Sequence, residues 1–250
     1  IETTAKPFLL AAAVSVVIGL FCFTLPAPPP PKTAAAVKLK SALGLDALVM
    51  LKDRSYLVFA IGSVLACIPL TFYFSFTNAF LNDEGVRNAA GKMTLGQASE
   101  VGAMLLMPFI FRRVTVKQIL VVGLAAWSAR YLLLAFGNAG TGMWMFYAAI
   151  LLHGICYDFF FMTGQLYTDQ QAPAHLRNSA QGLITFLTYG VGMFIGSLLS
   201  GGALDVFTTT VNGVVRRDWF GFWSVSSAGA FVLVLMVVAF FRTDSRIEAN

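Results

Sequence analysis

Long apolar runs separated by short polar connections make up most of the chain. Each run is about as long as the ~20 residues that a helix needs to cross the hydrocarbon core of a bilayer. The pattern therefore predicts an all-α fold, a polytopic membrane helical bundle. The apolar runs cover residues 7–25, 56–80, 93–111, 118–136, 142–167, 179–204 and 219–241.

The connection between the first two runs is the longest. It opens with the proline-rich residues 26–31, which cannot continue a helix and favour an extended spacer. Residues 38–52 then mix apolar and basic side chains with roughly helical spacing. This second pattern predicts either an amphipathic helix on the membrane surface or a solvated linker helix.

Composition supports a membrane protein. Of the 250 residues, 58% are hydrophobic and 12% are charged, whereas about a quarter of a soluble domain is charged. The net charge of +5 does not indicate a nucleic-acid partner, because the basic residues flank the apolar runs instead of forming a stripe. Cys22, Cys67 and Cys156 lie inside apolar runs without paired spacing, so we expect no disulfide, metal or other cofactor.

The basic residues also predict an orientation. Alternate connections of a multi-pass protein lie on opposite sides of the membrane, and the cytoplasmic ones carry the excess of Lys and Arg. The richer side holds Lys32, Lys38, Lys40, Lys52, Arg54, Arg112, Arg113, Lys117, Arg177, Arg242 and Arg246. The poorer side holds Lys6, Arg87, Lys92, Arg216 and Arg217. We therefore expect a multi-pass protein of the cell membrane (inner or plasma) with its long connection and C-terminus in the cytoplasm.

An imidazole, a phenol, a carboxylate and an amide (His153, Tyr157, Asp158 and Gln165) interrupt the apolar run at residues 142–167. His153 and Tyr157 lie four residues apart, on one face of a helix, and Asp158 lies on the neighbouring edge. A carboxylate at this depth costs about 2.5 kcal/mol or more, so it is expected to face away from lipid. The segment is predicted to line an aqueous cavity.

Two further runs carry polar pairs with a spacing of three, which places both members on one helix face. Ser75 pairs with Asn78 in one run, and Gln97 pairs with Glu100 in the next. Interhelical hydrogen bonds, worth about 0.6 kcal/mol on average, account for any one hydroxyl or amide alone. Pairs on consecutive helices together favour a shared cavity.

Arg130 is the only Lys or Arg inside the apolar runs. An ion pair with Arg130 is the structural alternative for both intramembrane carboxylates. For Glu100 we favour a protonatable or substrate-contacting role, and for Asp158 we favour proton transfer over direct pairing with Arg130.

The sequence contains no enzyme motif: Gly-x-Ser-x-Gly, His-Glu-x-x-His, a phosphate-binding loop and Cys-x-x-Cys are all absent. We expect no enzyme. A seven-helix receptor or sensor fits the number of runs. However, the chain starts at Ile1 and its first apolar run begins almost at once, so we expect a fragment that lacks its N-terminal part.

Several stretches resemble the bacterial nucleoside:H⁺ symporter family of the major facilitator superfamily. Residues 152–167, with the run LHGICYDFF, resemble its tenth helix, and residues 177–182 (RNSAQG) resemble the start of its eleventh. Residues 97–100 (QASE), followed by Met-Pro-Phe and Arg-Arg, resemble its eighth helix, and residues 76–78 resemble its seventh. The likeness covers roughly residues 56–205.

The resemblance implies helices six to twelve of a twelve-helix transporter. The fold would then be the C-terminal half of a major facilitator plus one preceding helix. Residues 1–25 would be the last helix of the N-terminal half, and 26–54 a cytoplasmic Pro-rich linker and amphipathic helix. Residues 55–242 would form the six-helix C-terminal bundle, and 243–250 a cytoplasmic tail.

The resemblance also implies a function, namely proton-coupled nucleoside symport by alternating access. Its partners would be a nucleoside, protons, the lipid bilayer and the remaining N-terminal helices. The family's substrate-binding positions correspond to Ser75, Asn78, Gln97, Glu100, His153 and Tyr157. The proton-coupling candidates are Asp158, Glu100 and Arg130. Ser75 stands where the family can have a longer amide, and His153 where it can have Tyr. A facilitator for another polar solute, such as a sugar, is the alternative within transport.

Overall fold

The computed structural model describes residues 4–26 and 44–243, and the chain divides into two compact units. The first unit contains α1 (Lys6–Cys22), an apolar helix of 17 residues with Pro7 in its first turn and no buried residue. Proline suits the first turn because its missing N–H has no intrahelical acceptor there. Residues 27–31 of the predicted proline-rich spacer lie outside the described residues.

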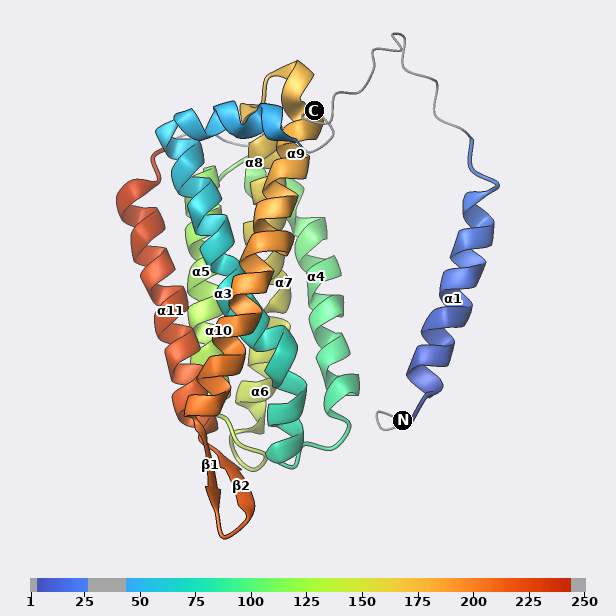
Figure 1. Ribbon diagram of the computed structural model, residues 1–250, viewed down its shortest axis with the longest axis vertical. Helices are drawn as coiled ribbons and strands as arrows, with labels where there is room; N and C mark the ends of the chain where they lie inside the picture. The colour runs from blue at the N-terminus through green and yellow to red at the C-terminus, as the bar shows by residue number, and fades with distance from the viewer. Residues whose placement is uncertain (1–3, 27–43, 244–250) are drawn as a thin grey trace. The chain divides into compact units, whose positions relative to one another are not determined.

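The second unit is a bundle of helices running up and down (Figure 1). Six helices of the described residues are long and apolar enough to cross a membrane. They are α3 (Arg54–Asp83); α4 (Ala89–Phe111); α5 (Val116–Phe136); the segment α6 (Met143–Leu151), α7 (His153–Tyr157), η2 (Asp158–Met162) and α8 (Thr163–Gln171); the segment η3 (Ala174–Leu176), α9 (Arg177–Thr185), η4 (Phe186–Gly192) and α10 (Met193–Val206); and α11 (Trp219–Phe240). These six confirm the predicted spans from residue 56 onward, whereas α1 is shorter than they are.

Aromatic packing and reciprocal hydrogen bonds join α5 to α11. Tyr131 stacks on Trp223 with ring centroids 5.7 Å apart. Ser128 Oγ donates to the Ser227 carbonyl at 3.1 Å, and Ser227 Oγ donates to the Ser128 carbonyl at 2.8 Å. Hydroxyls satisfied in this way do not carry the cost of an unpaired polar group in an apolar interior. The pair fixes α5, which carries Arg130, against the outer helix.

The helix η1 (Leu45–Lys52) covers one end of the bundle (Figure 1). It buries Ala47 and Met50 and packs against α3 and α9. Asp53 follows and caps α3 by accepting a hydrogen bond from the Tyr56 amide at 2.8 Å. The second half of the predicted amphipathic segment is therefore docked on the bundle end, whereas residues 38–43 lie outside the described residues.

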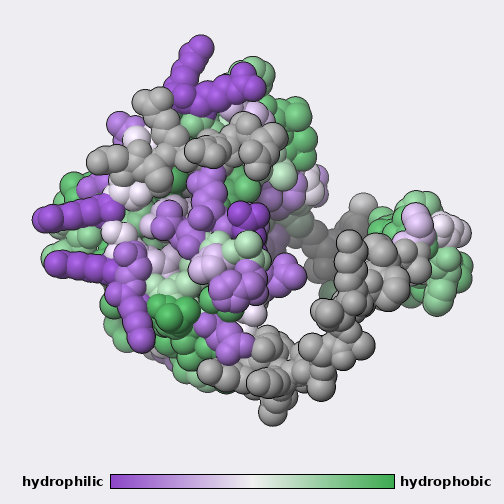
Figure 2. Space-filling model, turned by 90° about the horizontal axis from the view of Figure 1, so that it is seen from above, coloured by the Kyte–Doolittle hydropathy of each residue, from purple (hydrophilic) through white to green (hydrophobic). Residues whose placement is uncertain are grey.

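The same end collects most of the basic side chains of the bundle's described residues. Figure 2, which looks down on it, shows hydrophilic residues gathered there, with hydrophobic residues on the flanks. The connections of the bundle that meet at this end carry Lys52, Arg54, Arg112, Arg113, Lys117, Arg177 and Arg242. The excess of Lys and Arg that the sequence predicts for one side of the membrane thus lies at one end of the bundle.

A β-hairpin at the opposite end was not predicted from the sequence. Strands β1 (Thr208–Val211) and β2 (Val214–Arg217) pair antiparallel, and Asn212 and Gly213 form the turn with φ of 53° and 78°. Asn-Gly favours such a turn because both residues tolerate positive φ. At the base of the hairpin, Arg217 forms an ion pair with Asp83 at the end of α3, with Nη1 and Oδ2 2.7 Å apart.

The neighbourhood of Asp83 also affects the next residue. Burial raises the pKa of the Glu84 carboxyl, and the charge of Asp83 raises it further. Glu84 lies just beyond α3, outside the spanning segments.

Candidate functional site

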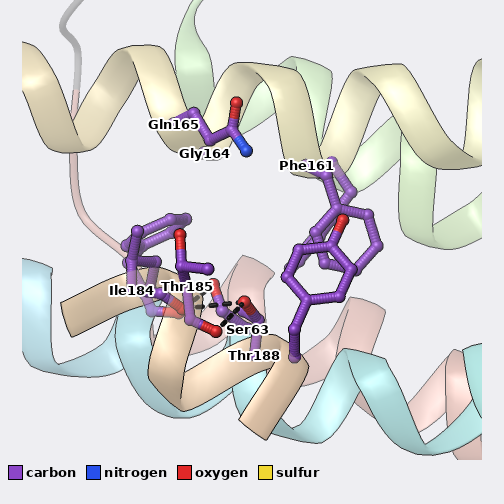
Figure 3. A pocket seen from close by; sticks show the side chains of 10 residues that line it. Ser63, Phe161, Gly164, Gln165, Ile184, Thr185 and Thr188 are labelled. Carbon is purple, nitrogen blue, oxygen red and sulfur yellow. Dashed lines mark hydrogen bonds between the residues drawn. The ribbon is translucent and has the colours of Figure 1, made fainter. Parts of the chain in front are cut away.

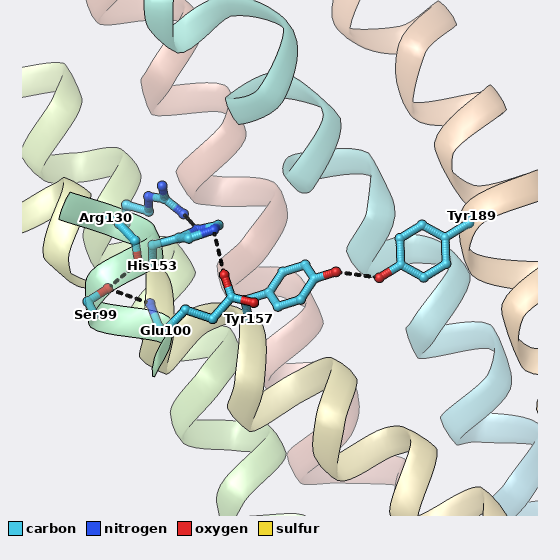
Figure 4. Close-up of polar contacts among 8 residues, drawn as sticks. Ser99, Glu100, Arg130, His153, Tyr157 and Tyr189 are labelled. Carbon is cyan, nitrogen blue, oxygen red and sulfur yellow. Dashed lines mark hydrogen bonds and ion pairs between the residues drawn. The ribbon is translucent and has the colours of Figure 1, made fainter. Parts of the chain in front are cut away.

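The polar segment around His153 departs from a regular α-helix. α6 ends at Leu151 and α7 begins at His153, and the turn from Asp158 to Met162 is a π-helix. The next span contains a second π-helical stretch, Phe186–Gly192. Single π-turns inside α-helices often occur at functional sites, and these two face each other. Tyr157 and Tyr189 are joined by a hydrogen bond between their hydroxyls (Figure 4).

Two glycines bring α4 and α7 close together. A Cβ on Gly154 would overlap the backbone of Ser99, and a Cβ on Gly96 would lie 3.3 Å from the His153 Cβ. The Gly154 amide donates to Ser99 Oγ at 3.1 Å. Without side chains at these positions the two backbones approach closely, as small residues permit in membrane bundles. This approach places Glu100 beside His153.

His153 lies between a cation and a carboxylate. Arg130 Nη1 is 3.1 Å from His153 Nδ1, and His153 Nε2 is 3.7 Å from Glu100 Oε2 (Figure 4). Arg130 and His153 are 0% and 3% exposed, whereas the Glu100 side chain is 27% exposed. The line of side chains thus runs from the interior of the bundle outward to a carboxylate that ligands can reach.

Aromatic rings enclose this line. The Tyr73 ring stacks on His153 at a centroid distance of 5.7 Å, and Phe74 meets the imidazole edge-on at 6.1 Å. The Arg130 guanidinium carbon lies 3.2 Å from the centroid of the Tyr73 ring, which is a cation–π arrangement. Tyr157 continues the wall, with its ring 5.7 Å from that of His153.

Asp158 adjoins the cluster but points inward. It is 2% exposed, and its Oδ2 atom has no hydrogen-bond partner among the described residues. It is near enough to Glu100 for the two carboxylates to interact electrostatically. A buried carboxyl oxygen without a partner is costly as an anion, so the protonated form is the one that suits this position.

The chain matches the family model "Nucleoside H+ symporter" over residues 1–246. The chain belongs to the nucleoside H⁺ symporter family. Among its relatives in Escherichia coli (strain K12) are YegT, 38% identical over 100% of this chain and 60% of that protein, and a xanthosine permease, 30% identical over 96% of this chain and 59% of that protein.

A solved structure of a nucleoside transporter has the same fold as this bundle. A mutant of the nucleoside transporter NupG matches with a TM-score of 0.81 and 28% identity, over 93% of this chain and 60% of that one. The chain thus has the all-α fold of a major facilitator transporter. It spans about 60% of the length of the relatives that it matches.

Other candidates of the symporter family's site lie around this cluster. Ser75 and Gln97 are exposed. Asn78 is half-buried, and its Oδ1 accepts a hydrogen bond from Asn82 Nδ2 at 2.9 Å. Asn78 lies one helical turn beyond Phe74, and Gln97 lies one turn before Glu100. The structure thus joins Arg130, His153, Glu100 and Tyr157 through contacts, whereas among the described residues no hydrogen bond or ion pair joins Ser75, Asn78 or Gln97 to them.

A narrow crevice lies between α3, the η2–α8 segment and the α9–η4 segment (Figure 3). Ser63, Gln165, Thr185 and Thr188 line it together with apolar side chains and Tyr189. Tyr189 therefore belongs both to the crevice and to the Tyr157 contact.

Sequence reasoning missed two members of this site in the symporter chain. Tyr73 and Tyr189 were not among the candidates, because in the sequence a functional Tyr in an apolar run looks the same as a Tyr that only packs in the core. Only the tertiary contacts, Tyr73 on His153 and Tyr189 on Tyr157, give them a place. The Arg130–His153 contact was missed for the same reason, since sequence reasoning considered only a carboxylate as its partner.

Proposed function

We propose that the transporter containing this chain carries nucleosides together with protons across the cell membrane by alternating access. The observation that carries the proposal is the meeting of Glu100, His153 and the Tyr157–Tyr189 pair, from three separate spans, at a half-exposed edge. Polar and titratable side chains thus meet inside an otherwise apolar bundle, where a polar solute can bind. The family membership and the relatives named for nucleosides support the same substrate class.

The side chains at this edge suit both parts of a nucleoside. Ribose hydroxyls donate hydrogen bonds to a carboxylate and can both donate to and accept from amides. We therefore assign the binding of the ribose to Glu100, Gln97 and Asn78. The base presents an aromatic face, which stacks on rings such as that of Tyr157. Ser75, whose side chain is short, contributes a hydroxyl.

Proton coupling is assigned to the two carboxyls. Asp158 is buried with an unpartnered oxygen and lies near Glu100. Two neighbouring carboxyls disfavour double ionisation, so a proton on one of them depends on the state of the other. Glu100 reaches the ligand edge, and we assign the coupling to the exchange of this proton as the site changes its exposure.

The end of the bundle under η1 is assigned to the cytoplasm, because it holds the larger group of basic residues. This orientation places the C-terminus inside and the β-hairpin outside. The domain division at residues 25, 54 and 242 follows from the same proposal. The remainder of the transporter, about two fifths of the length of the relatives, would complete the cavity.

Competition for uptake tests the substrate class. The full-length protein, in membrane vesicles, should accumulate a labelled nucleoside, and unlabelled nucleosides should abolish this accumulation. An excess of monosaccharides should leave it unchanged. Inhibition by sugars and not by nucleosides would instead support a facilitator for another polar solute.

A further inference from the structure

Arg130 is a buried cation whose nearest side-chain partner is an imidazole. Among the described residues it forms no ion pair with a carboxylate, and its Nε and Nη2 atoms have no hydrogen-bond partner. Its neighbours are His153, whose Nδ1 lies 3.1 Å from Nη1, the Tyr73 ring under the guanidinium, and the Cys156 thiol. A buried charge without a counter-ion is costly. We therefore expect the cationic donor itself to have a function at this position.

Hydrogen-bond chemistry determines what this contact requires of His153. A guanidinium has N–H donors and no acceptor. His153 Nδ1 must therefore accept, which means that it carries no proton. A neutral imidazole with a bare Nδ1 has its proton on Nε2, and Nε2 is the atom that faces Glu100 at 3.7 Å.

We propose that Arg130 is a positioning residue that holds His153 as the neutral tautomer protonated on Nε2. In this tautomer the Nε2–H group of the imidazole faces Glu100 Oε2 across 3.7 Å, and its positive end orients the carboxylate toward the ligand edge. His153 is then a fixed donor and does not take up the transported proton. Arg130 and His153 then serve only to orient the Glu100 carboxylate, and the transported proton is carried by other groups.

The surroundings of His153 agree with a single tautomer. From α3 it faces the Tyr73 ring, from α4 it faces Glu100, and from α5 it faces Arg130. On its own span the Tyr157 ring lies tilted against His153 at a centroid distance of 5.7 Å, and the Cys156 thiol interacts with Arg130. Arg130 is the group next to Nδ1, and a second proton on the ring would place two N–H donors face to face.

Measurement of the tautomer in the full-length, unliganded protein tests the proposal without reference to transport. Solid-state NMR of ¹⁵N-histidine-labelled protein in bilayers distinguishes protonated from bare ring nitrogens, and the difference spectrum against His153→Gln assigns the His153 signals. The expected result is a bare Nδ1 and a protonated Nε2 throughout about pH 5 to 8, the range in which histidine ordinarily changes charge. A proton on Nδ1, or a doubly protonated ring within that range, overturns the proposal.

The consequence for binding rests on the proposed function and is measured separately. Arg130→Met removes the donor, so His153 becomes free to take a second proton and to bind Glu100 as an imidazolium. Nucleoside affinity should then fall by about tenfold more than in the wild type between pH 8 and pH 5, since a charged partner competes for Glu100. Arg130→Lys retains a cationic donor and should restore the wild-type profile.

His153→Gln is the matched control, because its amide oxygen accepts from Arg130 and its NH₂ donates toward Glu100 without titrating. Adding Arg130→Met to this variant should introduce no extra pH dependence. The same extra pH dependence with and without His153 would overturn the proposal. If Arg130→Met does not fold, the tautomer measured in the wild-type protein still tests the proposal. If the wild-type protein binds no nucleoside, the proposed function fails, but the His153 tautomer can still be measured.

Discussion

At the scale of single residues, Asp158 and Glu100 are two carboxyls with different surroundings. Glu100 faces an imidazole and is partly exposed, whereas Asp158 is buried and one of its oxygens lacks a partner. A difference in environment is what separates the roles of neighbouring carboxyls in a site. Under the proposed function, this difference is the reason that we give ligand binding chiefly to Glu100 and proton storage chiefly to Asp158.

Asp158→Asn should abolish accumulation of nucleoside against a gradient while leaving binding intact, because the amide keeps the shape of the carboxyl and cannot exchange a proton. Uptake driven by an imposed proton gradient and equilibrium binding are the two measurements. Asp205→Asn, at an exposed position near the end of α10, is the matched control and should behave as wild type. Proton-driven accumulation by Asp158→Asn equal to that of the wild type would remove Asp158 from the coupling.

At the scale of elements, the site depends on how closely α4 and α7 approach. Their contact at Gly154 and Ser99 leaves no room for a Cβ, and the Gly154 amide donates to Ser99 Oγ. The two π-helical stretches meet where Phe161 stacks on Tyr189, and Tyr157, the last residue before the first stretch, bonds the Tyr189 hydroxyl. Local departures from the α-helix thus coincide with the polar contacts.

Gly154→Ala should destabilise the bundle by about 1–3 kcal/mol, the usual cost of overpacking, and should weaken nucleoside binding by separating Glu100 from His153. Gly102→Ala is the control on α4, because a Cβ there meets no atom within 4 Å. Replacing this helical glycine should stabilise the protein by about 0.5–1 kcal/mol. Thermal unfolding of both variants, with binding measured alongside, distinguishes them; equal behaviour would contradict the close contact.

Sequence patterns predicted the elements better than the contacts between them. Hydrophobic runs located the six long spans, and the spacing of His153 and Tyr157 placed both on the side of the site, because helical periodicity depends on local sequence alone. The Arg130–His153 contact joins residues of different spans, and no local pattern specifies it. The hairpin had a local signal in Asn212-Gly213 between β-branched residues, which was overlooked because the stretch was treated as a plain connection.

At the scale of the whole molecule, the bundle has one basic end and one end that carries the β-hairpin. The orientation proposed from this asymmetry predicts opposite labelling of cysteines introduced at the two ends. Thr210→Cys in β1 should react with a membrane-impermeant maleimide in intact cells. Arg113→Cys, between α4 and α5, should react only after permeabilisation. The reverse pattern would contradict the orientation. Cys22, Cys67 and Cys156 are replaced by Ala in the background protein.

The central claim is that Glu100 forms part of a nucleoside site, and equilibrium binding to the purified full-length protein tests it most directly. Loss of hydrogen bonds to a charged group costs about 1.5–3 kcal/mol, so Glu100→Gln should weaken nucleoside binding by about tenfold to a hundredfold. Glu84→Gln, beyond the end of α3, is the control and should bind as wild type. Unchanged nucleoside affinity in Glu100→Gln would contradict the account.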